Sequence, residues 1–224
     1  MCKYVVVDLE MCKVPYRLRK ETSFIARETI QIGAVLVNEN LEIIDKFMTY
    51  VSPERGWIDD YINKLTGISN DDVVSAPSFK EALTSFVNWI PKDAKVVSWS
   101  DSDEIQIRSE IECKNVEIIG IEEVLENWID CQQVFGERIK VERSYGLKEA
   151  LCVADIPYEE IEHDGLVDAY NTALLFIKME REPELTLNPY YKSMIYGEEE
   201  EENKCCSSLG SLFSNLDLSG IAVA

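Results

Sequence analysis

The stretch YVVVDLEMC, residues 4–12, decides the fold, because it places two acidic residues directly after a run of three valines. Consecutive β-branched residues predict a buried strand at 3–8. Residues two apart in a strand point to the same side, so Asp8 and Glu10 project together with Cα atoms roughly 6.6 Å apart. The pair is either a solvated strand end or part of a cation site, and the rest of the chain has to distinguish these interpretations.

The size and composition are typical of one globular protein. A chain of 224 residues with 46% hydrophobic content allows one main core and a tail. The first residues lack the long apolar region of a signal peptide, and no later stretch is long and apolar enough to span a membrane. We therefore expect a soluble, cytoplasmic protein. Seven scattered cysteines without a CxxC pair argue against a disulfide framework and a zinc cluster, and predict reduced thiols.

The net charge opposes a simple nucleic-acid-binding role, since a formal charge of −20 repels a polyanion at long range. Residues 183–224 hold seven acidic and two basic residues, so −5 of the charge lies there and −15 in the remaining chain. Two basic clusters interrupt this background, and each is either solvated surface or a track for phosphates. They are Lys13, Arg17, Arg19, Lys20 and Arg27, and then Arg138, Lys140, Arg143 and Lys148.

Three strands are predicted near the N-terminus. Apolar and β-branched residues indicate strands at 28–37 and 41–50 after the first one, joined by a turn at 38–40. This spacing favours a β-meander. A short helical segment at 59–66 follows and ends at Gly67.

Strands and helices alternate in the later part of the chain. Ser78 and Glu81 form a capping box for a helix that Pro91 ends. The remaining predicted elements are a strand at 94–100, a helix at 102–112 with Ile105 and Ile111 facing inward, a helix at 146–156, and a final helix at 163–181 with Tyr170 among its buried residues. Elements in this order predict an α/β fold with a mixed sheet.

Two segments allow more than one interpretation. The apolar residues of 122–136 fit one long helix, or a strand at 127–131 followed by a helix. The chain after Pro183 is predicted to be a tail with a glutamate run at 198–202. The tail is either solvated or docks, on the body or on a partner, through apolar residues at helical spacing: Leu209, Leu212, Phe213 and Leu216.

Two further acids follow the strand that ends in SWS. Asp101 and Asp103 come at the carboxyl end of that strand, where open α/β sheets place their sites. Asp101 has Glu104 three residues on, so we predict that it caps the helix. Asp103, inside the first turn, is the better candidate for a metal ligand.

The final helix supplies the other candidate residues. Asp164 is predicted to cap the helix, which places His163 on the preceding loop and Asp168 in the opening turns. On a continuous helix, residues five apart lie about 140° apart, so His163 and Asp168 converge only if the histidine precedes the helix. His163 is the only histidine of the chain, so no other imidazole can serve as a base.

Together, Asp8-x-Glu10, Asp103 and His163-x4-Asp168 resemble the motif of the DEDDh exonucleases, a branch of the ribonuclease H-like fold. The resemblance covers residues 3–180. It extends to WS-x-x-D at 99–103, LTGIS at 65–69 and WIDC at 128–131. SYGLKEAL at 144–151 is most similar to the Eri1-type subgroup, which includes RNA 3′-end trimming enzymes and bacterial KapD-type proteins. Two positions depart from the family pattern, because Ser100 stands where glycine is frequent and Gln31 where a second acid is frequent.

The resemblance implies a fold and a domain division. It implies a ribonuclease H-like α/β domain at 1–182, with a mixed five-stranded sheet whose first three strands are antiparallel and which helices flank. Residues 183–224 would be an acidic tail, with an unknown protein partner if it has one. No membrane partner is expected.

The resemblance also implies a mechanism. Asp8, Glu10, Asp103 and Asp168 would hold two Mg²⁺ or Mn²⁺ ions, with His163 as general base. The enzyme would release nucleoside 5′-monophosphates from the single-stranded 3′ end of RNA or DNA. The alternative is a non-catalytic regulatory protein that keeps the fold and binds protein partners, and the complete set of acids and histidine favours the enzyme.

A nucleotide pocket follows from the same resemblance. The terminal nucleotide would be bordered by Leu9, Met11, Leu65 and Thr66. Leu9 and Leu65 suit a hydrophobic core equally well, so both interpretations stay open.

Overall fold

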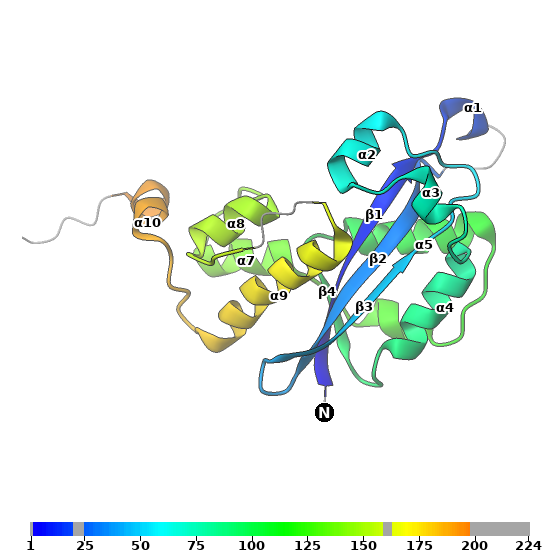
Figure 1. Cartoon of the computed structure of the whole chain (residues 1–224). Coiled ribbons are helices and arrows are strands. Elements are labelled where there is room, and N and C mark those ends of the chain that lie inside the picture. Colours follow the sequence, from blue (N-terminus) through cyan, green and yellow to red (C-terminus); the bar gives the residue numbers. More distant parts are fainter. Residues whose placement is uncertain (1, 20–24, 159–162, 198–224) are drawn as a thin grey trace, which may run out of the picture. The chain divides into compact units, whose positions relative to one another are not determined.

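The computed structural model describes residues 2–19, 25–158 and 163–197 (Figure 1). It divides into two compact units, residues 1–188 and 189–224. The first unit extends past Glu182, because Leu187 is buried and the Asn188 N–H donates to the Val153 carbonyl at 2.9 Å. Several predictions concern residues outside the described part, namely those on Lys20, on the glutamates at 198–202 and on the apolar residues at 209–216.

A five-stranded mixed sheet forms the centre of the first unit, with the strand order β3-β2-β1-β4-β5. Its strands are β1 (Cys2–Lys13), β2 (Arg27–Asn38), β3 (Ile43–Tyr50), β4 (Lys95–Ser98) and β5 (Trp128–Asp130). The first three are antiparallel, and β4 runs parallel to both β1 and β5. The predicted sheet is confirmed.

The helices that the structure describes are α1 (Tyr16–Arg19), α2 (Asp60–Thr66), α3 (Asn70–Val73), α4 (Phe79–Trp89), α5 (Ser102–Lys114), α6 (Ile121–Glu126), α7 (Cys131–Ile139), α8 (Leu147–Val153), α9 (Gly165–Arg181) and α10 (Pro189–Tyr196). The ambiguous stretch is a strand followed by a helix, β5 and then α7. Helix α10, in the second unit, begins at a proline, a residue tolerated in the first turn of a helix. None of the described helices is long and apolar enough to cross a membrane.

Strand β1 is longer than predicted. Asp8 and Glu10 lie within it, because β2 continues to pair with β1 as far as Lys13, opposite Arg27. The prediction that the strand ends at Asp8 is wrong, since ladder hydrogen bonds join backbone groups whatever the side chains are. The two acids are therefore held by a rigid element.

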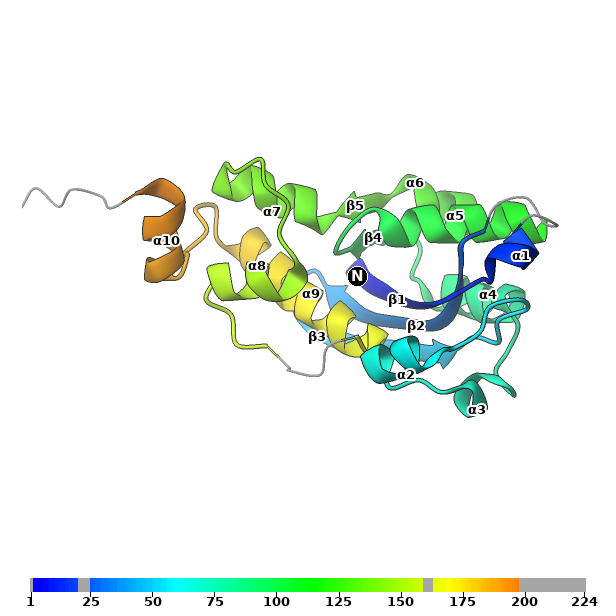
Figure 2. The same cartoon turned by 90° about the horizontal axis from the view of Figure 1, so that it is seen from above.

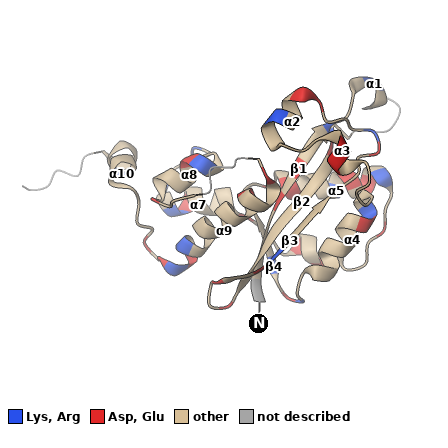
Figure 3. Ribbon diagram, viewed as in Figure 1, with Lys and Arg blue, Asp and Glu red and all other residues tan. Residues whose placement is uncertain are grey.

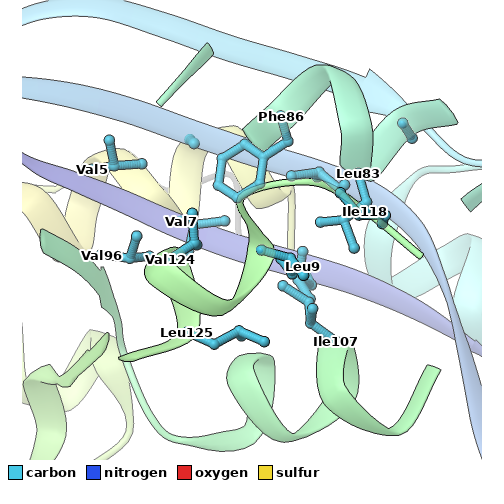
Figure 4. Close-up of a cluster of buried hydrophobic side chains, with 14 of the residues drawn as sticks. Val5, Val7, Leu9, Leu83, Phe86, Val96, Ile107, Ile118, Val124 and Leu125 are labelled. Atoms are coloured by element: carbon cyan, nitrogen blue, oxygen red, sulfur yellow. The ribbon is translucent and has the colours of Figure 1, made fainter. Parts of the chain in front are cut away.

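One face of β1 builds the main core. Val5, Val7 and Leu9 pack there with residues of α4, α5 and α6 (Figure 4). Helix α4 contributes the fully buried Phe86, and Ser78 and Glu81 form the predicted capping box at its start. Burial of these apolar side chains stabilises the helices on this face of the sheet.

Helix α9 covers the opposite face of β1. The Tyr4 ring meets the Phe176 ring edge-on, with centroids 4.8 Å apart. Small residues of α9, Ala169 and Ala173, are fully buried and allow the helix to approach the sheet. Asp8 and Glu10 share the face of Tyr4, because residues two apart in a strand point to the same side. The acids therefore lie on the sheet face that carries α9 (Figures 1 and 2).

Two predictions about helix faces are wrong. Ile105 and Tyr170 are exposed, although Ile111 is half-buried against the core as predicted. The inward face of α5 instead carries Asp103, Gln106 and Glu110 beside Ile107. Apolar periodicity does not detect a helix whose buried face is largely polar.

A buried ion cluster fastens α5 to β2. The Lys114 ammonium lies 2.8 Å from a Glu110 oxygen, 3.3 Å from Glu28 and 3.6 Å from Glu54. The other Glu110 oxygen accepts hydrogen bonds from the Thr29 amide at 3.1 Å and hydroxyl at 2.8 Å. These contacts fix the position of α5, and with it Asp103, relative to the sheet.

We expect Lys114→Met to lower the free energy of unfolding by about 3–5 kcal/mol, because Glu28 and Glu110 then stay buried without their cation. Urea denaturation measures the change. The control is Arg143→Met, whose ion pair with Glu149 lies at the surface, so a much smaller loss is expected. Equal losses for the two variants would show that the buried cluster does not stabilise the fold.

Candidate active site

The start of α9 carries three residues of the site. Asp164 caps the helix as predicted, since its carboxylate accepts the N–H groups of Leu166 at 3.0 Å and Val167 at 3.1 Å. His163 precedes the helix and Asp168 lies in its first turn. The His163 backbone N–H donates to Asp168 Oδ2 at 3.1 Å. This bond helps to hold His163 at φ 61°, a left-handed conformation that costs about 1–2 kcal/mol in a residue other than glycine.

The structure brings Glu10, His163 and Asp168 together. Each offers a ligand atom, and these atoms lie within 4.8 Å of one another. Asp8 lies two residues before Glu10 on the same face of β1. The histidine and the aspartate converge because the histidine stands outside the helix. Figure 3 shows acidic residues both on β1 and at the start of α9.

Asp103 reaches the site from α5. Its side chain is buried, and Oδ1 accepts the Leu9 backbone N–H at 3.1 Å. The predicted cap by Asp101 is wrong. Asp101 stands at the N-cap position, but its backbone is helical and its side chain makes no capping bond, while Glu104 pairs with Arg108 at 2.8 Å. N-capping side chains normally need an extended backbone.

Burial and mutual repulsion shift the pKa values of these carboxyl groups upward. Burial, then the charges of Asp103 and Glu10, raises the pKa of Asp8 well above its usual range. Burial, then the charge of Asp168, raises the pKa of Glu10 to about 8. Burial raises the pKa of Asp103 to about 7, although the bond from Leu9 and the charge of Arg27 oppose the shift. A divalent cation relieves this repulsion, and carboxylate oxygens are the ligands that Mg²⁺ and Mn²⁺ prefer, so the residues fit a metal site.

The raised pKa of Glu10 predicts how the stability of the metal-free protein depends on pH. The folded protein keeps the proton of this group, with a pKa of about 8, whereas the unfolded chain releases it near 4.5. Between these pH values the folded state binds more protons than the unfolded chain. The contribution of Glu10 to the free energy of unfolding is therefore full below pH 4.5 and is lost as the pH rises through about 8.

Thermal unfolding in a chelator should therefore show a Tm that falls between about pH 5 and 8, less steeply in Glu10→Gln. Saturating Mn²⁺ should reverse the trend in the wild type, because metal binding requires ionised carboxylates. An equal slope in the wild type and Glu10→Gln would contradict the assignment to Glu10.

Sequence reasoning missed two residues of β2 that position the site. Gln31 is fully buried, and its Oε1 accepts the Gly165 N–H at 2.8 Å while its Nε2 donates to Asp164 at 3.5 Å. Gly33 lies against Gly165, where a Cβ on Gly33 would stand 2.2 Å from the Gly165 carbonyl carbon. Both residues join β2 to the start of α9. The signal was present in QIGAV, where a polar residue and a glycine interrupt an apolar strand.

The structure does not gather the four predicted nucleotide-binding residues on one exposed surface. Leu9 belongs to the main core and Met11 packs against it. Leu65 is half-buried, and the Thr66 hydroxyl donates to the Ile62 carbonyl at 2.9 Å and accepts the Ile68 N–H at 3.1 Å. Their contact with a nucleotide stays a prediction.

A cavity of about 180 Å³ adjoins His163 and Asp168 between α8 and α9. Lys148, one member of the second basic cluster, lies at this cavity with its ammonium 5.7 Å from the centroid of the Tyr158 ring. A positive charge therefore stands beside the proposed metal ligands.

The family of the chain follows from comparison with known proteins. Residues 5–176 match the family described as Exonuclease, so the chain belongs to the exonuclease family. ERI1-type relatives and a solved DEDDh nuclease domain confirm the resemblance to the Eri1-type DEDDh enzymes and the ribonuclease H-like fold.

Individual relatives agree with this family. ERI1 exoribonuclease 2 of Danio rerio is 31% identical over 183 residues, which are 71% of this chain and 32% of the relative. The human 3′-5′ exoribonuclease 1 is 29% identical over 165 residues, covering 68% of this chain and 46% of the relative. The chain thus spans about a third to a half of the length of these relatives.

Solved structures show the same fold. The nuclease domain of 3′hExo, a DEDDh family member bound to rAMP, superimposes with a TM-score of 0.68 and 25% identity. The match covers 83% of this chain and 95% of that domain.

Proposed function

We propose that the chain is a metal-dependent 3′-to-5′ exonuclease, which removes nucleoside 5′-monophosphates from single-stranded 3′ ends of RNA or DNA. The observation that supports this proposal best is the convergence of Glu10, His163 and Asp168 from two elements. Asp8 and Asp103 complete the set of carboxylates. Relatives named exoribonucleases support RNA as a substrate class.

Asp8, Glu10, Asp103 and Asp168 would hold two Mg²⁺ or Mn²⁺ ions. Bound there, the ions would neutralise charge on the scissile phosphate and favour the ionisation of the attacking water. The rigid strand β1 and the buried face of helix α5 would fix three of these carboxylates before substrate arrives, which is what an in-line displacement requires of its surroundings.

His163 would accept the proton of the attacking water. Its backbone N–H is fixed by Asp168, which restricts where the imidazole can lie. The same imidazole is close enough to Glu10 and Asp168 to serve as a metal ligand instead. If His163 is the general base, its substitution lowers the reaction rate. If His163 is a metal ligand, its substitution lowers the affinity for the metal ion.

We expect His163→Ala to lower kcat by about 10²–10⁴-fold, because the general base is lost. The KM for RNA and the affinity for Mn²⁺ should change little. Mn²⁺ titration and steady-state kinetics measure both quantities. A loss of Mn²⁺ affinity as large as the loss of kcat would assign His163 to the metal instead.

The proposed reaction is tested with single-stranded RNA and DNA that carry a 5′ label. With Mn²⁺, we expect products that shorten stepwise from the 3′ end, together with free nucleoside 5′-monophosphates. Internal cleavage, or inactivity on both polymers, would overturn the proposed function.

A further inference from the structure

An exposed tryptophan is paired with the strand that carries two of the proposed metal ligands. Trp57 is 62% exposed, although tryptophan usually buries most of its surface. Its backbone is held, because it forms an antiparallel bridge with Lys13 in which the Trp57 N–H donates to the Lys13 carbonyl at 3.2 Å. The Trp57 side chain is thus exposed to solvent, while its backbone is fixed by the bridge.

The packing of the chain places the segment that follows this tryptophan on the carboxylate face of the sheet. Cys12 follows Asp8 and Glu10 on the same side of β1, and it forms a small core with Ile58 and Ile62. Helix α2, which begins three residues after Trp57 at Asp60, therefore covers the sheet immediately beyond Glu10. In both views α2 lies beside the N-terminal end of α9 (Figures 1 and 2).

A lysine and a second aromatic ring accompany Trp57. The Lys13 ammonium lies 4.9 Å from the centroid of the Tyr61 ring, and Tyr61 is 61% exposed. Lys13 follows Glu10 by three residues, or about 10 Å along the strand. Alternation along the strand directs the Lys13 and Glu10 side chains to opposite sides of β1. The Lys13 ammonium nevertheless reaches α2, where it meets the Tyr61 ring.

We propose that Trp57 and Lys13 form a platform for the single-stranded nucleic acid upstream of the scissile phosphate. A base stacks on the Trp57 ring, and Lys13 pairs with a backbone phosphate. Aromatic rings bind single strands of any sequence in this way, because every base has a π-face. This inference rests on the proposed function and adds the part of the substrate that would lie outside the reacting centre.

The charge of the protein favours stacking as the main source of affinity. A net charge of −20 repels a polyanion, so long-range attraction cannot hold the strand. Of the acids nearest the platform, Asp59 caps α2 by accepting the Ile62 N–H at 2.9 Å, and Glu54 pairs with Lys114. Asp60 is exposed beside Tyr61. Base stacking on an aromatic ring does not require a positively charged surface. The positive charge of Lys13 compensates for part of the negative charge of these acids.

The test compares a single strand of twelve nucleotides with a dinucleotide that has the same 3′ residue. Trp57→Ala should raise the KM for the long strand by about 10-fold, as expected for one lost stacking contact. Its kcat on the long strand should remain, and cleavage of the dinucleotide should change by less than about 2-fold, since that substrate is too short to reach the platform. Trp57→Phe should keep most of the affinity.

Matched controls separate the platform from general effects of charge and aromatic content. Tyr190→Ala, at a ring that is 67% exposed in the second unit, should not change the KM. Lys13→Ala should lower the slope of log KM against log salt by about 0.7, the value for one phosphate contact on a single strand. Lys92→Ala should leave the slope unchanged.

Tryptophan fluorescence tests the platform without catalysis. In an Asp8→Asn background, the twelve-nucleotide strand should quench emission, and Trp57→Phe should remove most of the quenching. The inference is overturned if Trp57→Ala matches Tyr190→Ala on the long strand, if the dinucleotide loses as much as the long strand, or if quenching persists without Trp57. Failure of the wild type to release nucleotides would instead overturn the proposed function, and the quenching would still test the platform.

Discussion

Asp8→Asn is expected to reduce nucleotide release by about 10³-fold or more, and to raise the Tm of the metal-free protein. The amide removes a charge that metal binding requires. In the metal-free state, burial and then repulsion from Asp103 and Glu10 disfavour the ionised form of Asp8 and raise its pKa, and a neutral amide does not carry this cost. Loss of activity with a gain in stability is typical of a functional site that holds like charges close together at a cost in stability.

The matched control is Asp101→Asn. Asp101 stands at the N-cap position of α5, two residues before Asp103, but it is exposed and makes no capping bond. It should keep wild-type activity within about 2-fold and change the stability by less than about 0.5 kcal/mol. An Asp8→Asn variant with more than a tenth of wild-type activity would remove Asp8 from the metal site.

Gly33→Ala is expected to lower the free energy of unfolding by about 3 kcal/mol and activity by about 10²-fold. A Cβ at this position would stand 2.1 Å from the Leu166 nitrogen and 2.5 Å from the Gly165 oxygen. These are backbone atoms, so the start of α9 has to move. That segment carries His163 and Asp168, and a displacement of about 1 Å is enough for such a loss of rate.

Gly146→Ala provides the control for Gly33→Ala. A Cβ at Gly146 meets nothing within 4 Å, and its backbone has an ordinary φ of −68°. We expect a change below about 1 kcal/mol, the scale of an N-cap glycine replaced by alanine. Urea denaturation and the release of nucleotides measure both variants. Equal behaviour would mean that close contact between β2 and α9 is not needed.

The resemblance of the ordered acids and histidine to a known motif predicted the candidate site. The structure brings Glu10, His163 and Asp168 together, and Asp103 accepts the Leu9 N–H next to Asp8. The cap by Asp164 was predictable because capping is local chemistry. Local rules therefore predicted this cap correctly, while the roles of the other site residues stay predictions.

Long-range packing limited the rest of the prediction. The roles of Gln31 and Gly33 depend on where α9 packs against the sheet, and the spacing of residues along the chain does not predict that position. The buried face of α5 was misassigned because Glu110 pairs with Lys114 and binds Thr29, so tertiary contacts reverse the usual meaning of a charged residue. The surface role of Lys13 likewise becomes visible only when Trp57 and Tyr61 are placed beside it.

The most direct test of the metal site is anomalous diffraction from crystals soaked with Mn²⁺ and a nucleoside 5′-monophosphate. We expect two peaks about 3.5–4 Å apart among the oxygens of Asp8, Glu10, Asp103 and Asp168. Neither peak should remain at full height in Asp8→Asn. Soaked crystals in which the nucleotide is bound but no Mn²⁺ peak lies among these four carboxylates would contradict the account.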